Sequence, residues 1–68
     1  MNDEVLINFG KKVKEIRKAM NLTQQELAYR SGLSRIEIGL IERGQKNIQL
    51  TTIERVAKAL DCEIKYLF

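Results

Sequence analysis

Residues 22–44 read LTQQELAYRSGLSRIEIGLIERG, and this stretch decides the fold. Thr23 stands three residues before Glu26, and Ser34 stands three residues before Glu37. Each pair has the spacing of a capping box, in which the hydroxyl and the carboxylate each accept a hydrogen bond from the other residue's amide. A glycine follows each segment. We therefore predict two short helices, one from Thr23 to about Arg30 or Ser31 and one from Ser34 to Arg43.

The connection between these two helices is short. Only Ser31, Gly32 and Leu33 separate the end of the first helix from the cap of the second. A turn this tight, with a glycine free to adopt a positive φ, makes two helices cross steeply instead of lying antiparallel. Ala28 is small enough to let the second helix approach closely. The pattern predicts a helix-turn-helix at about residues 23–43.

The flanking segments are helical in pattern as well. Upstream, apolar residues recur at alternating spacings of three and four, which is typical of one buried helical stripe. They predict a helix from about residue 4 to Met20, weakened by Gly10 and ended by Asn21. Downstream, Thr51 and Glu54 predict a third capping box and a fourth helix, and residues 61–68 predict a final helical turn or two that packs Ile64, Leu67 and Phe68. We expect one all-α domain over residues 1–68, a compact bundle of about five short helices.

Composition narrows the possible functions. A chain of 68 residues buries a small core and has no room for a deep substrate cavity beside it. It has no histidine and one cysteine, Cys62, which excludes an internal disulfide and a cysteine zinc site. The serines and threonines are used in turns and caps, and the acidic residues do not converge. We therefore expect no enzyme, no metal, no cofactor and no small-molecule ligand.

Charge and hydropathy give weaker indications. The 12 lysines and arginines against 9 acidic residues give a net charge of +3, which is compatible with nucleic acid without demonstrating it. The longest N-terminal apolar run is residues 5–7, too short for a membrane span, and Asp3 and Glu4 stand where a basic leader would begin. A lone cysteine fits a reducing compartment. We expect a cytoplasmic protein with no membrane partner.

The strings Leu22–Ala28, Ser31–Ser34 and Ile41–Gly44 closely resemble the Cro and phage-repressor type of helix-turn-helix regulators, the XRE family. The similarity extends through residues 57–60 and 67–68 and covers about residues 6–68. It implies a lambda-repressor-like fold and a sequence-specific regulator of transcription that binds double-stranded DNA. It further implies a repressor-like homodimer that reads an inverted-repeat operator, with the helix of residues 34–43 in the major groove.

The same resemblance assigns roles to residues of that helix. Arg35 stands at its start, where the family inserts its base readers, and a guanidinium there would fork onto guanine O6 and N7. A helical wheel places Ile36, Gly39 and Leu40 on the side away from Ile38. In a recognition helix, Ile36 and Leu40 would pack against thymine methyl groups and Gly39 would let the backbone approach DNA. On a generic helix, the same apolar pair would be extra core or a sticky patch.

A second set of residues is expected at the DNA backbone. Gln24 lies in the first turn of its helix, where free amides and the positive helix end suit a phosphate, and the family binds phosphate there. The family also directs the loop after the recognition helix to the sugar-phosphate strand. That loop contains Arg43, Gln45, Lys46 and Asn47. Taken alone, each of these is equally typical of a solvated polar residue.

Arg17 and Glu42 form a structural ion pair by the same resemblance. Glu42 falls on the apolar face of its helix with Ile38 and Ile41, and a carboxylate buried there without a partner would be costly. We interpret the pair as orienting the recognition helix. Loss of one partner is then expected to reduce stability more than loss of both.

Two questions stay open at the level of sequence. A protein-interaction module, such as an antitoxin-like partner, would also use an exposed Ile36–Leu40 face. The resemblance places the dimer surface near the loop after residue 43 and the C-terminal segment, with Ile48, Tyr66 and Phe68 as candidates. The fold alone does not distinguish a repressor, an activator, a restriction–modification controller or an antitoxin, and the operator cannot be derived from the helix.

Overall fold

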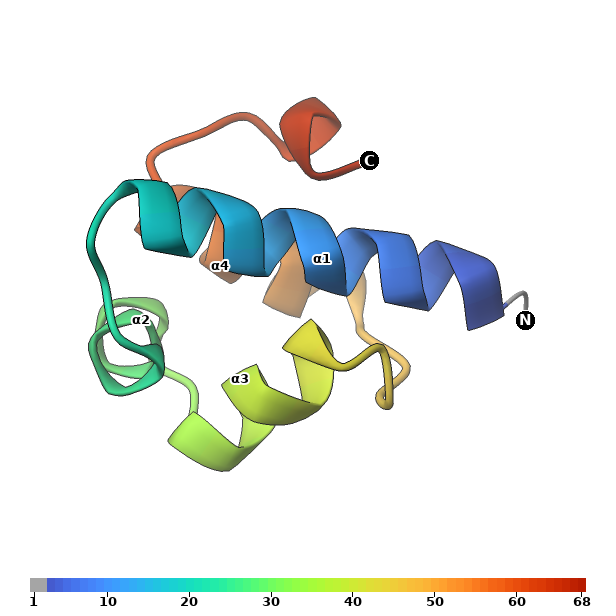
Figure 1. The fold of residues 1–68 in the computed structure, drawn as a ribbon, viewed down its shortest axis with the longest axis horizontal. Helices are drawn as coiled ribbons and strands as arrows, with labels where there is room; N and C mark the ends of the chain where they lie inside the picture. The colour runs from blue at the N-terminus through green and yellow to red at the C-terminus, as the bar shows by residue number, and fades with distance from the viewer. Residues whose placement is uncertain (1–2) are drawn as a thin grey trace.

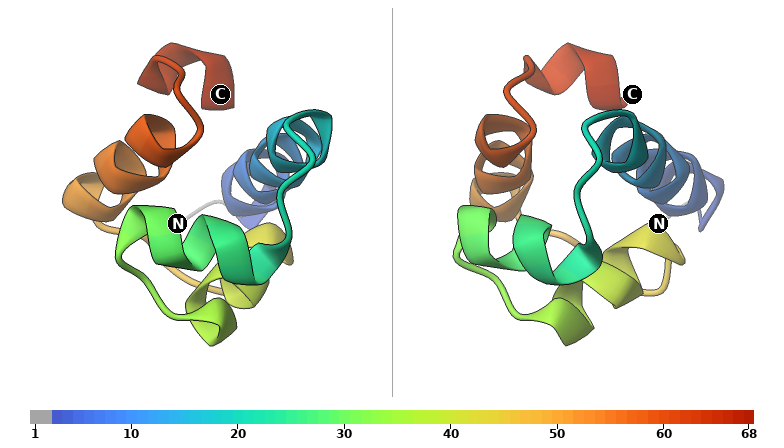
Figure 2. Two further views of the ribbon diagram at one scale, coloured as in Figure 1. Left: turned by 90° about the vertical axis from the view of Figure 1, so that its left-hand side faces the viewer. Right: turned by 60° about the vertical axis from the view of Figure 1, so that its left-hand side comes forward.

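The computed structural model describes residues 3–68, which form four α-helices and one short 3-10 helix. The helices are α1 (Asp3–Ala19), α2 (Gln24–Ser31), α3 (Arg35–Glu42), α4 (Leu50–Ala59) and the 3-10 helix η1 (Ile64–Leu67). Figure 1 shows α1 crossing the molecule with α3 on one side of it and η1 on the other. In both views of Figure 2, α2 and α3 again lie at the end opposite η1. The predicted all-α bundle is confirmed for these residues.

Both capping boxes of the central segment are present. The Thr23 hydroxyl accepts from the Glu26 amide at 3.0 Å, and Glu26 Oε1 accepts from the Thr23 amide at 2.8 Å. The Ser34 hydroxyl and the Glu37 carboxylate make the equivalent two hydrogen bonds, each of 3.1 Å. Each box satisfies an amide at the start of its helix that the helix itself leaves unpaired. The start of α2 and the start of α3 are therefore fixed by local sequence.

The turn between α2 and α3 is left-handed at Gly32, with φ 72°. The Leu33 amide donates to the Ala28 carbonyl at 3.0 Å, which closes the end of α2 before α3 begins. The predicted stops at Asn21 and Gly44 also adopt positive φ, 58° and 70°, and Asp61 adopts 54°. Short helices joined by such turns pack at steep angles, as Figure 1 shows for α2 and α3.

The third predicted capping box is wrong. The helix α4 begins at Leu50, and its N-cap is Gln49, which makes no side-chain capping hydrogen bond. Thr51 therefore lies inside the helix. In that register the Glu54 amide is placed to donate to the Leu50 carbonyl four residues earlier, so Thr51 has no unpaired amide to cap.

The core is formed by side chains from all five helices and from the turn before α2. Its buried apolar members are Phe9, Val13, Leu22, Leu27, Ala28, Ile38, Ile41, Ile53, Val56, Ala57, Leu60 and Leu67. Of the three C-terminal residues expected to pack inward, only Leu67 is buried, while Ile64 and Phe68 are 42% and 61% exposed. The Phe68 ring nevertheless stacks on Phe9 with the ring centroids 5.0 Å apart.

Cys62 is half-buried against this core. Burial, together with the negative charge of Asp61, raises the pKa of its thiol above the ordinary value. The thiolate is therefore disfavoured at neutral pH. Along residues 3–68, no helix combines the length and the apolar character needed to cross a bilayer.

Candidate nucleic-acid interface

The N-terminal end of α3 projects from the body of the molecule. Arg35 and Ile36 directly follow the Ser34 cap, and Figure 1 shows this end of α3 at the edge farthest from η1. Arg35 is exposed and the Ile36 side chain is 71% exposed, whereas Leu40, one turn further on, is half-buried. The exposed apolar surface of α3 is therefore centred on Ile36 and does not extend evenly to Leu40.

The helical wheel places Gly39 on the outward side of α3, but in the structure Gly39 is a buried residue of that helix. A Cβ added to Gly39 would lie 3.3 Å from Nη1 of Arg43, so the Arg43 side chain covers the glycine. The space next to the Gly39 backbone, which we expected to admit DNA, is occupied by a guanidinium in the free protein.

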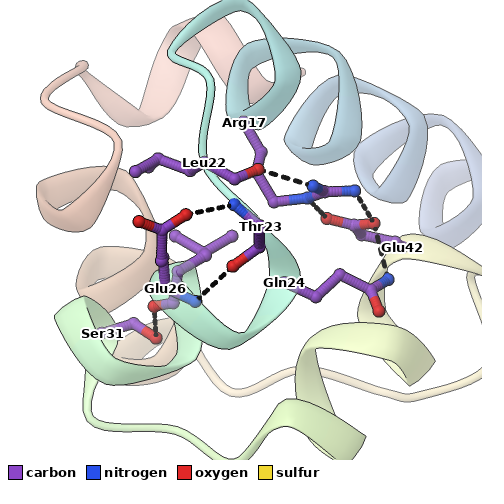
Figure 3. Close-up of polar contacts among 8 residues, drawn as sticks. Arg17, Leu22, Thr23, Gln24, Glu26, Ser31 and Glu42 are labelled. Carbon is purple, nitrogen blue, oxygen red and sulfur yellow. Dashed lines mark hydrogen bonds and ion pairs between the residues drawn. The ribbon is translucent and has the colours of Figure 1, made fainter.

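A buried polar network holds the other end of α3. Arg17 Nε donates to Glu42 Oε2 at 2.6 Å and Arg17 Nη2 donates to Glu42 Oε1 at 3.0 Å, which makes the pair bidentate (Figure 3). Arg17 Nη1 donates to the Leu22 carbonyl at 2.7 Å. The structure thus brings together the two residues expected to pair. Because both charges are hydrogen-bonded as well as paired, the carboxylate is tolerated on the apolar face of α3.

Gln24 belongs to the same network. Its Nε2 donates to Glu42 Oε1 at 3.0 Å, so the side chain points toward the interior and not directly toward solvent (Figure 3). Glu42 therefore links α1, α2 and α3 through one carboxylate. The Gln24 amide nitrogen carries a second hydrogen, and Gln24 remains half-buried at the first turn of α2.

The loop after α3 carries the four residues expected at the DNA backbone. Arg43, Gln45 and Asn47 are exposed and Lys46 is half-buried. Arg43 Nε donates to Gln45 Oε1 at 3.1 Å, and Lys46 Nζ lies 2.9 Å from Glu37 Oε2. This loop and the start of α1 enclose a shallow hollow of about 580 Å³. Its lining consists of Asp3, Leu6, Ile7, Arg43, Gly44, Gln45, Lys46 and Asn47.

Glu37 has a second role that the capping motif did not indicate. Its carboxylate both caps α3 and pairs with Lys46, and these two contacts, the hydrogen bond to Lys46 first, lower its pKa below 4.5. The loop residue Lys46 is therefore tied to the first turn of α3. The spacing of nine residues between them gave no signal, because it bridges a helix and a loop.

Sequence reasoning also missed two exposed apolar residues, one at the start of α4 and one in η1. Leu50 is 81% exposed at the start of α4, and Ile64 lies across a shallow groove from it. Leu50 directly precedes the segment assigned to a cap, and Ile64 was assigned to the core. Apolar character in a short helix does not by itself reveal which side faces outward.

Comparison with known proteins gives a consistent result. The helix-turn-helix family model matches residues 13–67. The control protein C.BamHI of Bacillus amyloliquefaciens is 40% identical over 68 residues, covering 98% of this chain and 84% of that protein. The immunity repressor protein of Bacillus phage phi105 is 44% identical over 55 residues, which are 81% of this chain and 38% of the repressor.

A solved structure agrees with these sequence matches. The restriction-modification controller protein C.AhdI from Aeromonas hydrophila superimposes with a TM-score of 0.91 and 46% sequence identity. The match covers 93% of this chain and 96% of that structure. The similarity therefore extends to the fold and to nearly the full length of the C.AhdI structure.

Proposed function

Because this chain belongs to the helix-turn-helix family of DNA-binding transcriptional regulators, which are not enzymes, we propose that it reads an inverted-repeat operator as a homodimer. In this proposal residues 1–68 act as one DNA-binding domain, and α3 enters the major groove. The observation that carries it is the projecting N-terminal end of α3. It presents a free arginine beside an apolar side chain that is 71% exposed, on a helix whose other end is fixed by buried hydrogen bonds.

Base reading is assigned to the outward residues of α3. Arg35 forms the bidentate contact to guanine O6 and N7, which is the commonest specific contact in the major groove. Ile36 packs against a thymine methyl group, and Leu40 adds a smaller contact because it is half-buried. Burial of Ile36 against DNA removes exposed apolar surface from water, which accounts for an isoleucine at this position.

Contacts to the DNA backbone orient the recognition helix. Gln24 uses one amide hydrogen on Glu42 and offers the other, with the free amides of the first turn of α2, to a phosphate. Arg43, Gln45, Lys46 and Asn47 contact the next phosphates along the strand. For Lys46 this contact competes with its ion pair to Glu37, so binding of a phosphate exchanges one anionic partner for another.

The dimer surface is proposed on the side of the molecule that carries α4 and η1. Tyr66 and Phe68 are 58% and 61% exposed, and Leu50 with Ile64 adds a neighbouring apolar groove. Ile48 packs partly against the core and contributes less. Symmetric half-sites require the two α3 helices of such a dimer to lie about one helical turn of DNA apart.

The relatives favour a regulatory role of the controller kind. The chain spans most of the control protein C.BamHI and of the controller C.AhdI, but only 38% of the phage immunity repressor. The proposed role is therefore that of the small control proteins, which these residues match over most of their length.

Selection of random duplex DNA with the purified protein at physiological salt tests the proposal. We expect enrichment of an inverted repeat with half-sites about one turn apart. On that site Arg35→Ala costs about 1–3 kcal/mol of binding free energy, with little loss on random DNA. Lys18→Ala, which removes an exposed cation from α1 that has no part in the proposed DNA and dimer contacts, is the control and leaves both affinities unchanged.

Two results would contradict the proposal. If no sequence is enriched and the weak binding disappears as salt rises, the Ile36 face is better explained as a surface for a protein partner. If Arg35→Ala weakens binding to operator and random DNA equally, Arg35 contacts phosphate and does not read a base.

A further inference from the structure

Gly39 has no evident structural reason to be glycine. Gly32 and Gly44 adopt positive φ, and Gly10 lies against the backbone of α3. At Gly39 the φ is not in the positive region, and the three atoms nearest to an added Cβ all belong to the Arg43 guanidinium. A glycine inside a helix is less favourable than alanine, so its presence in the eight-residue α3 calls for a compensating function.

The Arg43 side chain lies over this glycine and is hydrogen-bonded to the following loop. Arg43 follows Gly39 by four residues, and its side chain extends back over the preceding turn so that Nη1 would lie 3.3 Å from a Cβ at position 39. Its Nε donates to Gln45 Oε1 at 3.1 Å, an exposed hydrogen bond from the loop side. Within residues 3–68, this is the one side-chain hydrogen bond of Arg43, so the four N–H groups on Nη1 and Nη2 are available to a ligand.

The position of this guanidinium is consistent with a ligand on the outer surface of α3. On the helical wheel, Arg43 shares the outward side of α3 with Ile36 and Leu40. Arg43 is itself exposed, and it lies beside the hollow formed by residues 43–47 and the start of α1. The planar guanidinium of Arg43, with the N–H groups on Nη1 and Nη2 free, matches the geometry of two phosphate oxygens.

We propose that Gly39 is a positioning residue for DNA binding: its missing side chain lets Arg43 lie flat on α3, where Gln45 holds it ready for a bidentate phosphate contact. The inference rests on the proposed function. It deepens that function, because it replaces a direct approach of the Gly39 backbone to DNA with a role exerted through Arg43. A guanidinium that is already in place loses less side-chain entropy on binding than a free one.

The test is a double-mutant cycle of Gly39→Ala and Arg43→Ala on the enriched operator and on random DNA. Arg43→Ala weakens binding to both DNAs alike, by roughly tenfold, and reduces the salt slope by about one. Gly39→Ala weakens binding by roughly three- to tenfold while its melting temperature is equal to or above that of the wild type. In the Arg43→Ala background, Gly39→Ala has no further effect on affinity, because the group it positions is absent.

A measurement without DNA checks the positioning directly. In the free wild-type protein, the Arg43 Nε–H exchanges with water more slowly than that of the exposed Arg30, and Gly39→Ala removes the difference. Equal exchange at the two arginines in the wild type would refute the fixed position of Arg43.

The binding outcomes separate this inference from the proposed function. A wild type that selects no DNA overturns both. A wild type that selects an operator, with Gly39→Ala equally harmful in the presence and absence of Arg43, overturns only the positioning role and supports direct approach of the helix backbone to DNA. Full affinity in Gly39→Ala overturns it as well.

Discussion

Substitution of Gly10 by alanine is expected to force α1 and α3 apart. A Cβ at position 10 would lie 2.8 Å from the Glu42 carbonyl oxygen and 3.0 Å from the Glu42 carbonyl carbon, and it would meet the Ile41 carbonyl oxygen even more closely. These atoms belong to the backbone of α3 and cannot rotate away. To reach an ordinary contact of 3.4 Å, the Glu42 oxygen alone must move by about 0.6 Å from 2.8 Å.

The magnitude follows from three contributions. Overpacking of this kind costs about 1–3 kcal/mol of unfolding free energy. Alanine returns about 0.5–1 kcal/mol, because it is the better helix former. The forced movement of Glu42 also lengthens its short hydrogen bonds to Arg17, and a charged hydrogen bond contributes about 1.5–3 kcal/mol. Because these hydrogen bonds lengthen without breaking, they lose only about 1 kcal/mol of that contribution. We expect a net loss of about 2–3 kcal/mol, a large share of the roughly 3–10 kcal/mol typical of a domain of this size.

Urea and thermal denaturation followed by circular dichroism measure this loss. A destabilisation of this size lowers the melting temperature by about 10–20 °C in so small a domain. The matched control is Gly39→Ala, a second helical glycine, where the added Cβ meets only the flexible end of Arg43. It is expected to keep or raise the melting temperature. A Gly10→Ala protein as stable as the wild type would refute the close crossing of α1 and α3.

Three further predictions use the same assays. Arg17→Met leaves the Glu42 carboxylate buried without its cation and destabilises the fold by about 3–5 kcal/mol. Adding Glu42→Leu to this variant restores much of the lost stability, and additive losses in the double variant would contradict the paired role. Thr23→Ala removes the N-cap of α2 and costs about 0.5–2 kcal/mol of unfolding free energy. Thr51→Ala costs little, because Thr51 caps no helix. Equal losses of stability in the two variants would show that Thr51 is a cap. The hydrogen bond from the Thr23 amide lowers the pKa of Glu26 below 4.5, so its stabilising contribution is complete above about pH 4.5 and is lost as pH falls through the folded-state pKa. Glu26→Gln should therefore flatten the decrease of the urea midpoint between pH 5 and 3, and an unchanged decrease would exclude this carboxylate as a source.

The sequence predicted best where the interactions are local. Thr23 and Glu26, like Ser34 and Glu37, are three residues apart, and hydrogen bonds at that distance depend on the neighbouring residues alone. Thr51 and Glu54 have the same spacing, yet the N-cap of α4 is Gln49, two residues before Thr51. A motif therefore identifies a possible cap, and the actual first residue of the helix decides whether the motif is used.

Contacts between distant segments could not be predicted in this way. Nothing near Gly10 in the sequence shows that it faces the backbone of residues 41–42. From the sequence, Gly10 was therefore expected only to weaken its own helix. The exposure of Ile64 and Phe68 and the covering of Gly39 by Arg43 likewise depend on packing in three dimensions. The residues next to these positions in the sequence do not show whether an apolar side chain is buried or exposed, or whether a glycine is covered by another side chain.

The structure divides α3 into two halves with different tasks. Its C-terminal half is fixed by the Gly10 contact, by buried Ile41 and by the carboxylate of Glu42, which receives hydrogen bonds from two other helices. Its first residues, Arg35 and Ile36, are exposed and contribute no buried contact. Substitutions at the first two positions should therefore change what the helix binds with little effect on folding, whereas substitutions in the fixed half act on stability first. This separation lets such a small domain change its recognition surface without losing the geometry that presents it.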